Sequence, residues 1–546
     1  MRKTTSATCR STNLAIANAL AVARQRVTGH LEYKAVARRQ ALARLRYAAM
    51  AETRELPALL SWDLDRTIPL LIGGDEVGGH AGGTFASIDP STGAQHAEVA
   101  SASARDVDDA VAAARAASEG PWGATPPLER GRILAAAARA LAERREELAR
   151  LDALDAGLPL WMARADVDNA IRYFEFFAGA ADKVYGDTIP LGPGVFDFTQ
   201  REPYGVCGVI TPFNVPVQMV ARSVAPALAT GNAVVVKPAE QAPLPALELG
   251  RLLASCGLPP GVVNVVPGLG AEAGARLAAH PDLDHLTFTG SLATGRQVAA
   301  AAAAEMTPMT IEAGGKSPQV VFADAPVEAA LNAIVGSALL TAGQVCSAGT
   351  RILIEDAAYA QVAELIVKRA KRIRIGRALD NPEMGPLISE LQQRRVLDAV
   401  GAAADSAVEL LAGGARPGDD RLAGGFFVEP TVFGDVDPSA PIAREEVFGP
   451  VLVLQRFASR EQALRMANDS EFGLVAGVWS DDVGAALEFA RSIRAGQVFV
   501  NNYGVGGGVE LPFGGYKKSG IGREKGVAAL SEYTQIKNVC IRTSVP

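Results

Sequence analysis

Two side chains in this sequence are suited to covalent catalysis, because each lies among small residues that can form a tight, accessible turn. Cys346 is part of the segment GQVCSAGTR, residues 343–351, and Glu312 opens the segment EAGGK, residues 312–316. A thiol is intrinsically very nucleophilic and could attack a carbonyl carbon. A carboxylate on a neighbouring turn could then activate water against the covalent adduct. The pair predicts nucleophilic catalysis that ends in hydrolysis.

A glycine-containing loop predicts a dinucleotide site. The segment FTGSLATG, residues 288–295, follows a short apolar stretch and precedes a helical pattern. Gly290 and Gly295 would let the backbone approach a pyrophosphate, and a helix that begins near Ser291 would offer free N–H groups to it. The glycine spacing differs from the common GxGxxG pattern. Residues 268–274 look closer to that pattern, but we interpret them as a structural turn.

The composition indicates a globular protein of two or three domains. The chain has 546 residues, of which 21% are charged, and a formal net charge of −7. This length exceeds what one hydrophobic core usually serves, and the acidic balance argues against nucleic acid as a partner. No apolar run approaches the roughly eighteen residues of a membrane span, so no membrane partner is expected.

Neither a disulfide framework nor a metal site is expected. The five cysteines are odd in number and form no CxxC pair, and the five histidines show no metal-ligand spacing. This cysteine usage predicts a reducing, cytoplasmic location. Three cysteines outside the Cys346 segment are expected to be buried or incidental thiols, namely Cys207, Cys256 and Cys540.

Strands and helices alternate along most of the chain, which predicts an α/β fold with a parallel, Rossmann-like sheet. A second alternating region is expected from residue 319 to about residue 500. Ser103 and Asp106 predict the capping box of an early helix. The remaining expected elements are an early hairpin from 70–74 and 85–90, helices at 128–155 and 165–185, a projecting hairpin at 188–201, and strands at 209–210, 234–236, 262–266 and 286–288.

Together these segments resemble the NAD(P)-dependent aldehyde dehydrogenase superfamily, from about residue 70 to about residue 533. The resemblance implies oxidation of an aldehyde to a carboxylic acid. Cys346 would form a thiohemiacetal, hydride transfer to NAD would leave a thioester, and Glu312 would activate the water that hydrolyses it. Asn214, in the segment TPFNVP, matches the family's oxyanion residue. Loss of one such donor typically slows catalysis about a hundred- to a thousandfold.

The resemblance also implies a cofactor site, which we expect to take NAD in preference to NADP. Lys237 and Glu240, in the segment KPAE, match residues that bind the adenosine ribose. A carboxylate there would accept a hydrogen bond from a free 2′-hydroxyl and repel a 2′-phosphate. Glu446 and Phe448, in EEVFGP, match residues at the nicotinamide ribose and ring. The other implied cofactor contacts are Thr211, Pro212, Gly290, Ser291 and Gly295.

The implied fold combines a Rossmann-like cofactor domain, an α/β catalytic domain and a small β flap for oligomerisation. The flap implies a homodimer or a homotetramer. The expected bounds are 61–182 and 206–313 for the cofactor domain, 314–524 for the catalytic domain, and 183–205 and 525–546 for the flap.

A basic amino-terminal extension, residues 1–60, is expected to lie outside this fold. Its first 49 residues are rich in lysine and arginine, and Met50 would make an ordinary start. The extension is consistent with an incorrectly assigned upstream start, with an organelle-targeting segment or with a structural arm.

Three departures from the family pattern bear on the substrate. Ala313 follows the base where leucine is usual, Phe213 precedes Asn214 where tryptophan is commoner, and Ser223 stands where many members carry lysine. The segment RSVAP, residues 222–226, resembles members that act on aromatic aldehydes. The sequence leaves the aldehyde itself open.

Other activities remain as alternatives. An acylating enzyme that transfers the acyl group to coenzyme A, or a semialdehyde-type enzyme, would share the thiol. Acylating relatives typically lack the hydrolytic carboxylate, so Glu312 argues against them. A cysteine hydrolase would need a histidine base, and no histidine lies in a comparable segment. A non-catalytic binding protein would have a damaged site.

Overall fold

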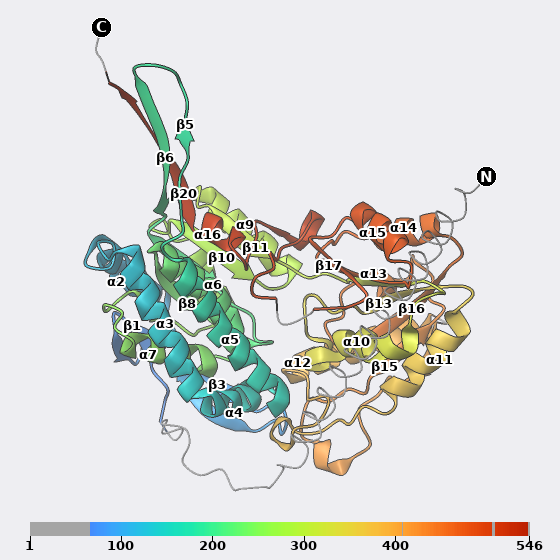
Figure 1. The fold of residues 1–546 in the computed structure, drawn as a ribbon. Coiled ribbons are helices and arrows are strands. Elements are labelled where there is room, and N and C mark those ends of the chain that lie inside the picture. Colours follow the sequence, from blue (N-terminus) through green and yellow to red (C-terminus); the bar gives the residue numbers. More distant parts are fainter. Residues whose placement is uncertain (1–65, 407, 505–507, 544–546) are drawn as a thin grey trace, which may run out of the picture. The chain divides into compact units, whose positions relative to one another are not determined.

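The strands expected between residues 206 and 289 form the middle of an eight-stranded sheet (Figure 1). The computed structural model describes residues 66–406, 408–504 and 508–543. The order of this sheet is β19-β11-β10-β7-β8-β9-β1-β2, and the strands from β11 to β9 run parallel. Its strands are β1 (Leu70–Ile72), β2 (Asp75–Val77), β7 (Val206–Ile210), β8 (Ala233–Lys237), β9 (Val263–Val265), β10 (His285–Thr289), β11 (Met309–Glu312) and β19 (Gly520–Ile521).

Helices cover both faces of this first sheet. Along β8, Val234 and Val236 belong to one hydrophobic core and Val235 belongs to another, as in a strand that is buried on both sides. Helices α3 to α7 pack on the first of these cores, and α2, α8 and α9 on the second. Their bounds are α2 (Ala104–Glu119), α3 (Pro127–Glu143), α4 (Arg145–Ala156), α5 (Leu160–Ala180), α6 (Pro216–Thr230), α7 (Leu244–Ser255), α8 (Ala275–Ala278) and α9 (Leu292–Ala304).

The local predictions for this part were partly right. The Ser103–Asp106 capping box is present at the start of α2, and the turn expected at residues 268–274 contains a short π-helix, Gly270–Gly274. The early hairpin was wrong: β1 turns back on β2 at Gly73 and Gly74, while β3 pairs with β4. The predicted helix at 128–155 is interrupted at Arg144. The separate pair consists of β3 (Thr84–Ile88) and β4 (Gln95–Ala100).

The second alternating region forms a seven-stranded sheet with the order β14-β15-β16-β13-β12-β17-β18. Its strands run parallel except for the β14–β15 pair. Along β12, Val320 and Val321 belong to cores on opposite faces. The strands are β12 (Pro318–Val321), β13 (Arg351–Glu355), β14 (Glu409–Ala412), β15 (Thr431–Gly434), β16 (Val451–Phe457), β17 (Val475–Trp479) and β18 (Gln497–Val500). The helices are α10 (Val327–Leu339), α11 (Tyr359–Ala370), α12 (Glu390–Asp405), α13 (Pro441–Arg444), α14 (Arg460–Asn468) and α15 (Val483–Ser492).

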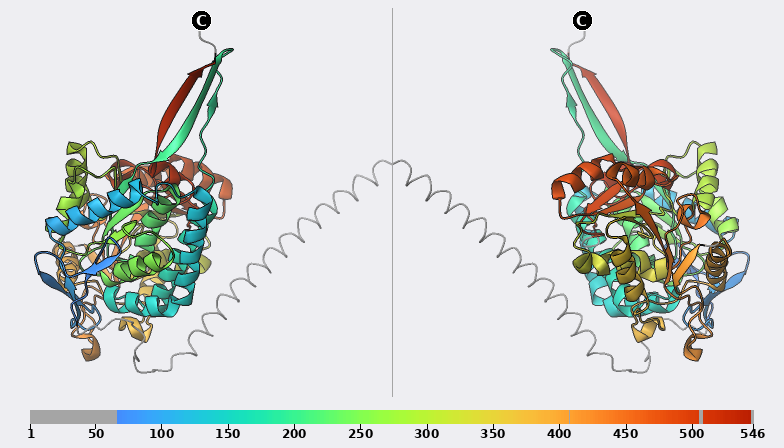
Figure 2. Two further views of the ribbon diagram at one scale, coloured as in Figure 1. Left: turned by 90° about the vertical axis from the view of Figure 1, so that its left-hand side faces the viewer. Right: turned by 90° about the vertical axis from the view of Figure 1, so that its right-hand side faces the viewer.

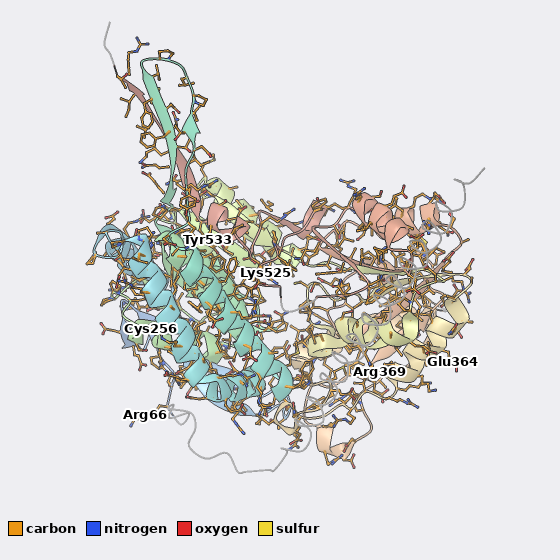
Figure 3. The ribbon with its side chains drawn as sticks, in the orientation of Figure 1. Arg66, Cys256, Glu364, Arg369, Lys525 and Tyr533 are labelled. Carbon is orange, nitrogen blue, oxygen red and sulfur yellow. The ribbon has the colours of Figure 1, made fainter. Side chains whose placement is uncertain are left out.

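A three-stranded flap consists of β5 (Thr188–Ile189), β6 (Val195–Pro203) and β20 (Thr534–Arg542). Figures 1 and 2 show these strands extending away from the helices. β20 pairs with β6 over its whole length, so the two segments predicted to make up the flap lie side by side. Tyr533, labelled at the base of the flap in Figure 3, lies 2.9 Å from the Thr287 hydroxyl of β10.

The described residues all fall in one compact unit. The predicted division into a cofactor and a catalytic domain is not tested by this and stays a prediction. One detail modifies it: β19, expected in the catalytic domain, pairs with β11 at the edge of the first sheet. The extension predicted at residues 1–60 lies outside the described residues. No described helix combines the length and the apolar character that crossing a bilayer requires.

Candidate active site

Glu312 is the last residue of β11, so its carboxyl group lies at the carboxyl-terminal edge of the parallel strands, where α/β folds usually bind ligands. Its carbonyl oxygen accepts a hydrogen bond from the Gly290 N–H at 3.0 Å. A Cβ atom at Gly514 would lie 2.9 Å from Glu312 Oε1. The site therefore needs a glycine there, and Glu312 lies beside the predicted dinucleotide loop.

The residue after the base is held by the carboxyl-terminal segment. Ala313 N donates to the Ser519 carbonyl oxygen at 2.8 Å, and the Ser519 hydroxyl donates to the Gly314 carbonyl oxygen at 2.8 Å. The same hydroxyl accepts a hydrogen bond from Gly473 N. One serine thus connects the Glu312 loop to the loop that precedes β17.

The Glu312 carboxyl group is buried, and no described residue forms a hydrogen bond to either of its oxygens. Burial raises the pKa of Glu312 to about 8, against the lowering effect of Arg222. A carboxyl group without fixed partners, whose pKa lies near neutrality, can take a proton from water.

Cys346 follows α10 and a turn in the left-handed region, where Thr341 has φ 50° and Gly343 has φ 77°. A Cβ atom at Gly343 would lie 2.0 Å from the Gly449 carbonyl oxygen, so the turn requires glycine there. Cys346 is half-buried and packs against a small cluster that contains Phe513. The tight turn thus brings the thiol to the cluster without burying it in a large core.

Burial raises the pKa of Cys346 to about 11, while the Arg222 charge lowers it and the Glu312 charge raises it. The sulfur is therefore a neutral thiol at neutral pH and must lose its proton as it reacts. Because the Glu312 charge acts on the Cys346 thiol, the two predicted catalytic groups lie close enough to interact electrostatically.

Asn214 connects the first sheet to the cysteine segment. It is buried in the loop after β7, and its Nδ2 donates to the Gln344 carbonyl oxygen at 2.8 Å. Gln344 precedes Cys346 by two residues, and its own side chain is fixed by a hydrogen bond from Ile388 N. The asparagine amide is therefore held beside the segment of the predicted nucleophile, and its role as an oxyanion donor stays a prediction.

The predicted dinucleotide loop joins β10 to α9. Ser291 caps α9, and its hydroxyl accepts a hydrogen bond from Thr294 N at 3.2 Å. Cβ atoms at Gly290 and Gly295 would lie 2.5 and 3.3 Å from the Phe288 ring. Gly290 therefore allows close packing of the turn on the ring, a Cβ at Gly295 would be a tight contact, and the start of α9 is exposed.

Lys237 and Glu240 lie at the end of β8, and Lys237 Nζ is 3.0 Å from Glu240 Oε2. Thr211 N donates to the Lys237 carbonyl oxygen at 3.1 Å, which brings the end of β7 to the same edge, with Pro212 next in the chain. Glu240 lines a cavity of about 710 Å³ together with Leu269, Ile388 and Arg416. Small-molecule sites commonly have volumes of roughly 300–1,000 Å³. An exposed helix start and an accessible carboxylate fit the phosphate and ribose groups of a dinucleotide.

Glu446 and Phe448 lie beside the Glu312 loop. Glu446 Oε1 accepts a hydrogen bond from Gly315 N at 2.9 Å, and burial raises the pKa of Glu446 to about 7. Phe448 has a left-handed backbone, φ 53°, and its ring packs edge-on against Phe213 at 6.0 Å between centroids. The unusual Phe213 thus contacts a predicted cofactor residue.

Sequence reasoning missed a buried charge cluster next to these groups. Arg222 of α6 forms an ion pair with Glu524, and both side chains are buried. The Arg222 guanidinium lies 4.5 Å and the Lys525 ammonium 4.8 Å from the centre of the Phe513 ring. The available signal was the pair of adjacent opposite charges, Glu524 and Lys525.

Comparison with known proteins decides the family. The model of the aldehyde dehydrogenase family matches residues 77–539. The chain belongs to this family. The aldehyde dehydrogenase is therefore an oxidoreductase that converts an aldehyde to a carboxylic acid, with a nicotinamide dinucleotide as the hydride acceptor. The predicted family, fold class and activity are confirmed.

Relatives match the aldehyde dehydrogenase over most of their length. Hydroxyisobutyraldehyde dehydrogenase of Mycolicibacterium austroafricanum is 44% identical over 488 residues, covering 88% of this chain and 96% of that protein. The mitochondrial aldehyde dehydrogenase of Homo sapiens is 41% identical over 464 residues, covering 84% and 89%.

Solved structures show the same fold. A putative aldehyde dehydrogenase from Burkholderia cenocepacia is 48% identical with a TM-score of 0.86, covering 87% of this chain and 100% of that chain. The NAD+ complex of an aldehyde dehydrogenase from Bacillus cereus is 39% identical with a TM-score of 0.88, covering 90% and 100%.

Proposed function

We propose that this aldehyde dehydrogenase works through a covalent adduct on Cys346 that is hydrolysed by water activated by Glu312. The observation that supports this most directly is the contact of Asn214 Nδ2 with the Gln344 carbonyl oxygen, 2.8 Å apart, beside the cysteine. It brings an amide donor to the cysteine segment, and Glu312, whose oxygens have no hydrogen bonds to described residues, lies at the carboxyl-terminal end of β11 in the first sheet.

In the first step, the Cys346 sulfur attacks the aldehyde carbon and the thiol proton is released. Asn214 Nδ2 and the Cys346 backbone N–H stabilise the negative charge on the former carbonyl oxygen. A bound nicotinamide dinucleotide supplies the acceptor for the hydride that leaves the thiohemiacetal carbon. Cys346 is then left as a thioester.

In the second step, Glu312 takes a proton from water. The water oxygen attacks the thioester carbon, the carbon–sulfur bond breaks, and the acid leaves as the Cys346 thiol is restored. Because the Glu312 oxygens have no hydrogen bonds to described residues, the carboxylate is free to accept this proton.

The experiment that tests the reaction combines the protein with an aldehyde and NAD. NADH should accumulate, followed by its absorbance, and chromatography should identify the matching carboxylic acid. If added coenzyme A diverts the product to a thioester, the hydrolytic role of Glu312 is wrong.

We further propose that the cofactor is NAD in preference to NADP. Glu240 lies beside Lys237 on the wall of the 710 Å³ cavity, where its charge would repel a 2′-phosphate. Glu240→Gln should lower the ratio of kcat/KM with NAD to kcat/KM with NADP. The matched control is Glu390→Gln, which changes another acid that lines the same cavity. If this ratio is unchanged in Glu240→Gln, Glu240 does not determine the preference for NAD.

The flap supports a proposal about assembly. It exposes large apolar side chains on both of its long strands, including Phe196 and Ile536, which are 47% and 62% exposed. We propose that the flap pairs with a second copy of the chain to give a homodimer or a homotetramer, because exposed strand edges favour such pairing. The molar mass in solution, measured by light scattering, should be lower for Ile536→Glu than for the unchanged protein.

A cytoplasmic location also stays a proposal. It is supported by the free thiols of Cys207, Cys256, Cys346 and Cys540, which form no disulfide among the described residues. Fractionation of source cells, with immunodetection of the protein, would test it.

A further inference from the structure

Lys525 is the cation of the buried charge cluster that has no carboxylate partner. Its ammonium group lies over the Phe513 ring, 4.8 Å from the centre, and no described carboxylate lies within ion-pairing distance of it. The neighbouring Glu524 is already paired with Arg222. Lys525 is half-buried, and contact with the Phe513 ring leaves the N–H groups of its ammonium able to donate hydrogen bonds to another group.

The position of Lys525 places this free capacity at the catalytic site. Phe513 belongs to the small cluster against which Cys346 packs, so one ring touches both the nucleophile's cluster and the Lys525 ammonium. Figure 3 labels Lys525 near the middle of the view, away from the flap. The Cys346 and Glu312 charges both act on the Lys525 ammonium. The free hydrogen-bonding capacity of Lys525 therefore lies near the predicted nucleophile.

The charges of the cluster do not balance without a further anion. Arg222 and Glu524 neutralise each other. Burial raises the pKa of Glu312 to about 8, so this carboxyl group is mostly neutral at pH 7. Burial lowers the pKa of Lys525 to about 8, so its ammonium group still carries a charge at pH 7. Among Arg222, Glu524 and Lys525, the Lys525 charge is therefore the one without an ion-pair partner among the described residues.

The Cys346 thiolate does not account for this surplus charge. Among the positive charges that lower the pKa of Cys346, Arg222 has a larger effect than Lys525. In addition, Lys525 has φ 63°, in the left-handed region that a lysine rarely adopts. Such backbone strain is commonly kept where it positions a functional side chain.

We propose that Lys525 is a specificity-determining residue whose ammonium group binds an anionic group of the substrate, so that the preferred substrates are aldehydes that carry a carboxylate. This inference rests on the proposed function and names its substrate class. The aldehyde carbon meets Cys346, and the carboxylate at the other end of the molecule forms a charge-assisted hydrogen bond with Lys525.

The test compares acids with neutral molecules of the same shape. The probes are 4-carboxybenzaldehyde with its primary amide, and succinic semialdehyde with its primary amide. For at least one pair, kcat/KM of the unchanged enzyme should be about tenfold or more higher for the acid, and Lys525→Met should reduce the ratio of acid to amide about ten- to a hundredfold. The effect should lie mainly in KM, and Lys525→Arg should retain most of the preference.

Lys518→Met is the matched control. Lys518 lies on the same carboxyl-terminal segment, but its ammonium group pairs with Glu471 at 2.7 Å and is half-exposed. This variant should leave the ratio of acid to amide unchanged. The thermal unfolding midpoints of the variants show whether each remains folded.

Three results would overturn the proposal. They are an unchanged enzyme that prefers neither acid over its amide, an equal loss for acid and amide in Lys525→Met, and an unchanged ratio in that variant. Failure of the underlying function looks different, because then no member of either pair would yield NADH.

Discussion

Two groups of buried carboxylates in this chain differ in what surrounds them. Near the Cys346 thiol, the charges of Arg222, Glu524 and Lys525 act on Glu312. The Glu312 oxygens have no hydrogen bonds to described residues. In the helical layer on the first sheet, Asp152, Asp155 and Asp166 lie on α4 and α5, and all three are buried.

The helical group uses its oxygens to hold backbone N–H groups. Asp155 accepts a hydrogen bond from Leu244 N at the start of α7, at 2.8 Å. Asp166 accepts one from Val217 N at the start of α6, at 3.0 Å. Asp152 interacts electrostatically with Asp166, and neither of its oxygens accepts a hydrogen bond from a described residue. These acids therefore join the helices and orient α6, the helix that carries Arg222.

The comparison shows that a shifted pKa does not by itself mark a catalytic group. Burial raises the pKa of Asp166 to about 7 and that of Asp152 well above its usual range, much as it raises that of Glu312. Both oxygens of Asp152 also lack hydrogen bonds to described residues, so what distinguishes Glu312 is the thiol on which its charge acts. A carboxyl group whose pKa is shifted can instead have a structural role when it belongs to a network that joins helices.

The largest expected effect is that of removing the nucleophile. Cys346→Ala should lower kcat by about four orders of magnitude or more, because no covalent adduct can form, while the affinity for NAD measured by calorimetry should change little. Cys540→Ser, which changes an exposed thiol of the flap, is the control and should retain full turnover. Substantial turnover by Cys346→Ala would exclude the covalent route.

Removing the base should have the next largest effect. Glu312→Gln should release one equivalent of NADH rapidly and then stall, because the thioester persists without an activated water. Steady turnover should fall about a hundred- to ten-thousandfold. Mass spectrometry of the stalled protein should find the acyl group on Cys346, and its absence would assign the stall to another step.

The rate of thioester hydrolysis should depend on pH with a defined sign. Glu312 acts as the base only after it loses its proton, and burial raises its pKa to about 8. Where hydrolysis limits turnover, the rate should therefore rise about tenfold between pH 7 and pH 9 and then level off. A rate that falls over this range would contradict the role of Glu312.

The smallest effect on activity is expected in the helical group. Asp152→Asn keeps a side chain that can donate to Asp166 and cannot ionise, so kcat should stay within about twofold. Because the pKa of Asp152 is raised in the folded protein, folding disfavours its ionised form at pH values above the ordinary range of aspartate. The variant should therefore gain stability against urea, relative to the unchanged protein, more at pH 8 than at pH 5.

The sequence was sufficient for features that lie in short segments. Cys346 and Glu312 each belong to a local run of small residues, and the α/β class follows from the alternation of strands and helices. The pairing of Arg222 with Glu524 could not be predicted, because the two residues are far apart in the chain and single charges usually lie on surfaces.

Two further results depend on three-dimensional packing. Gly290 of the dinucleotide loop is needed against the Phe288 ring as well as for any ligand, which no spacing pattern indicates. The prediction that residues 70–74 form a hairpin with residues 85–90 was wrong, because β1 pairs with β9 in the large sheet. A local pattern identifies a strand, but it does not identify the neighbour of that strand.

The carboxyl-terminal segment has a consequence for protein synthesis. Ser519 fastens the Glu312 loop, β19 completes an edge of the first sheet, Glu524 neutralises Arg222, and β20 supplies one strand of the flap. A ribosome makes all four after the segment that contains Cys346. The cysteine segment is therefore synthesised before the groups that complete the site around it.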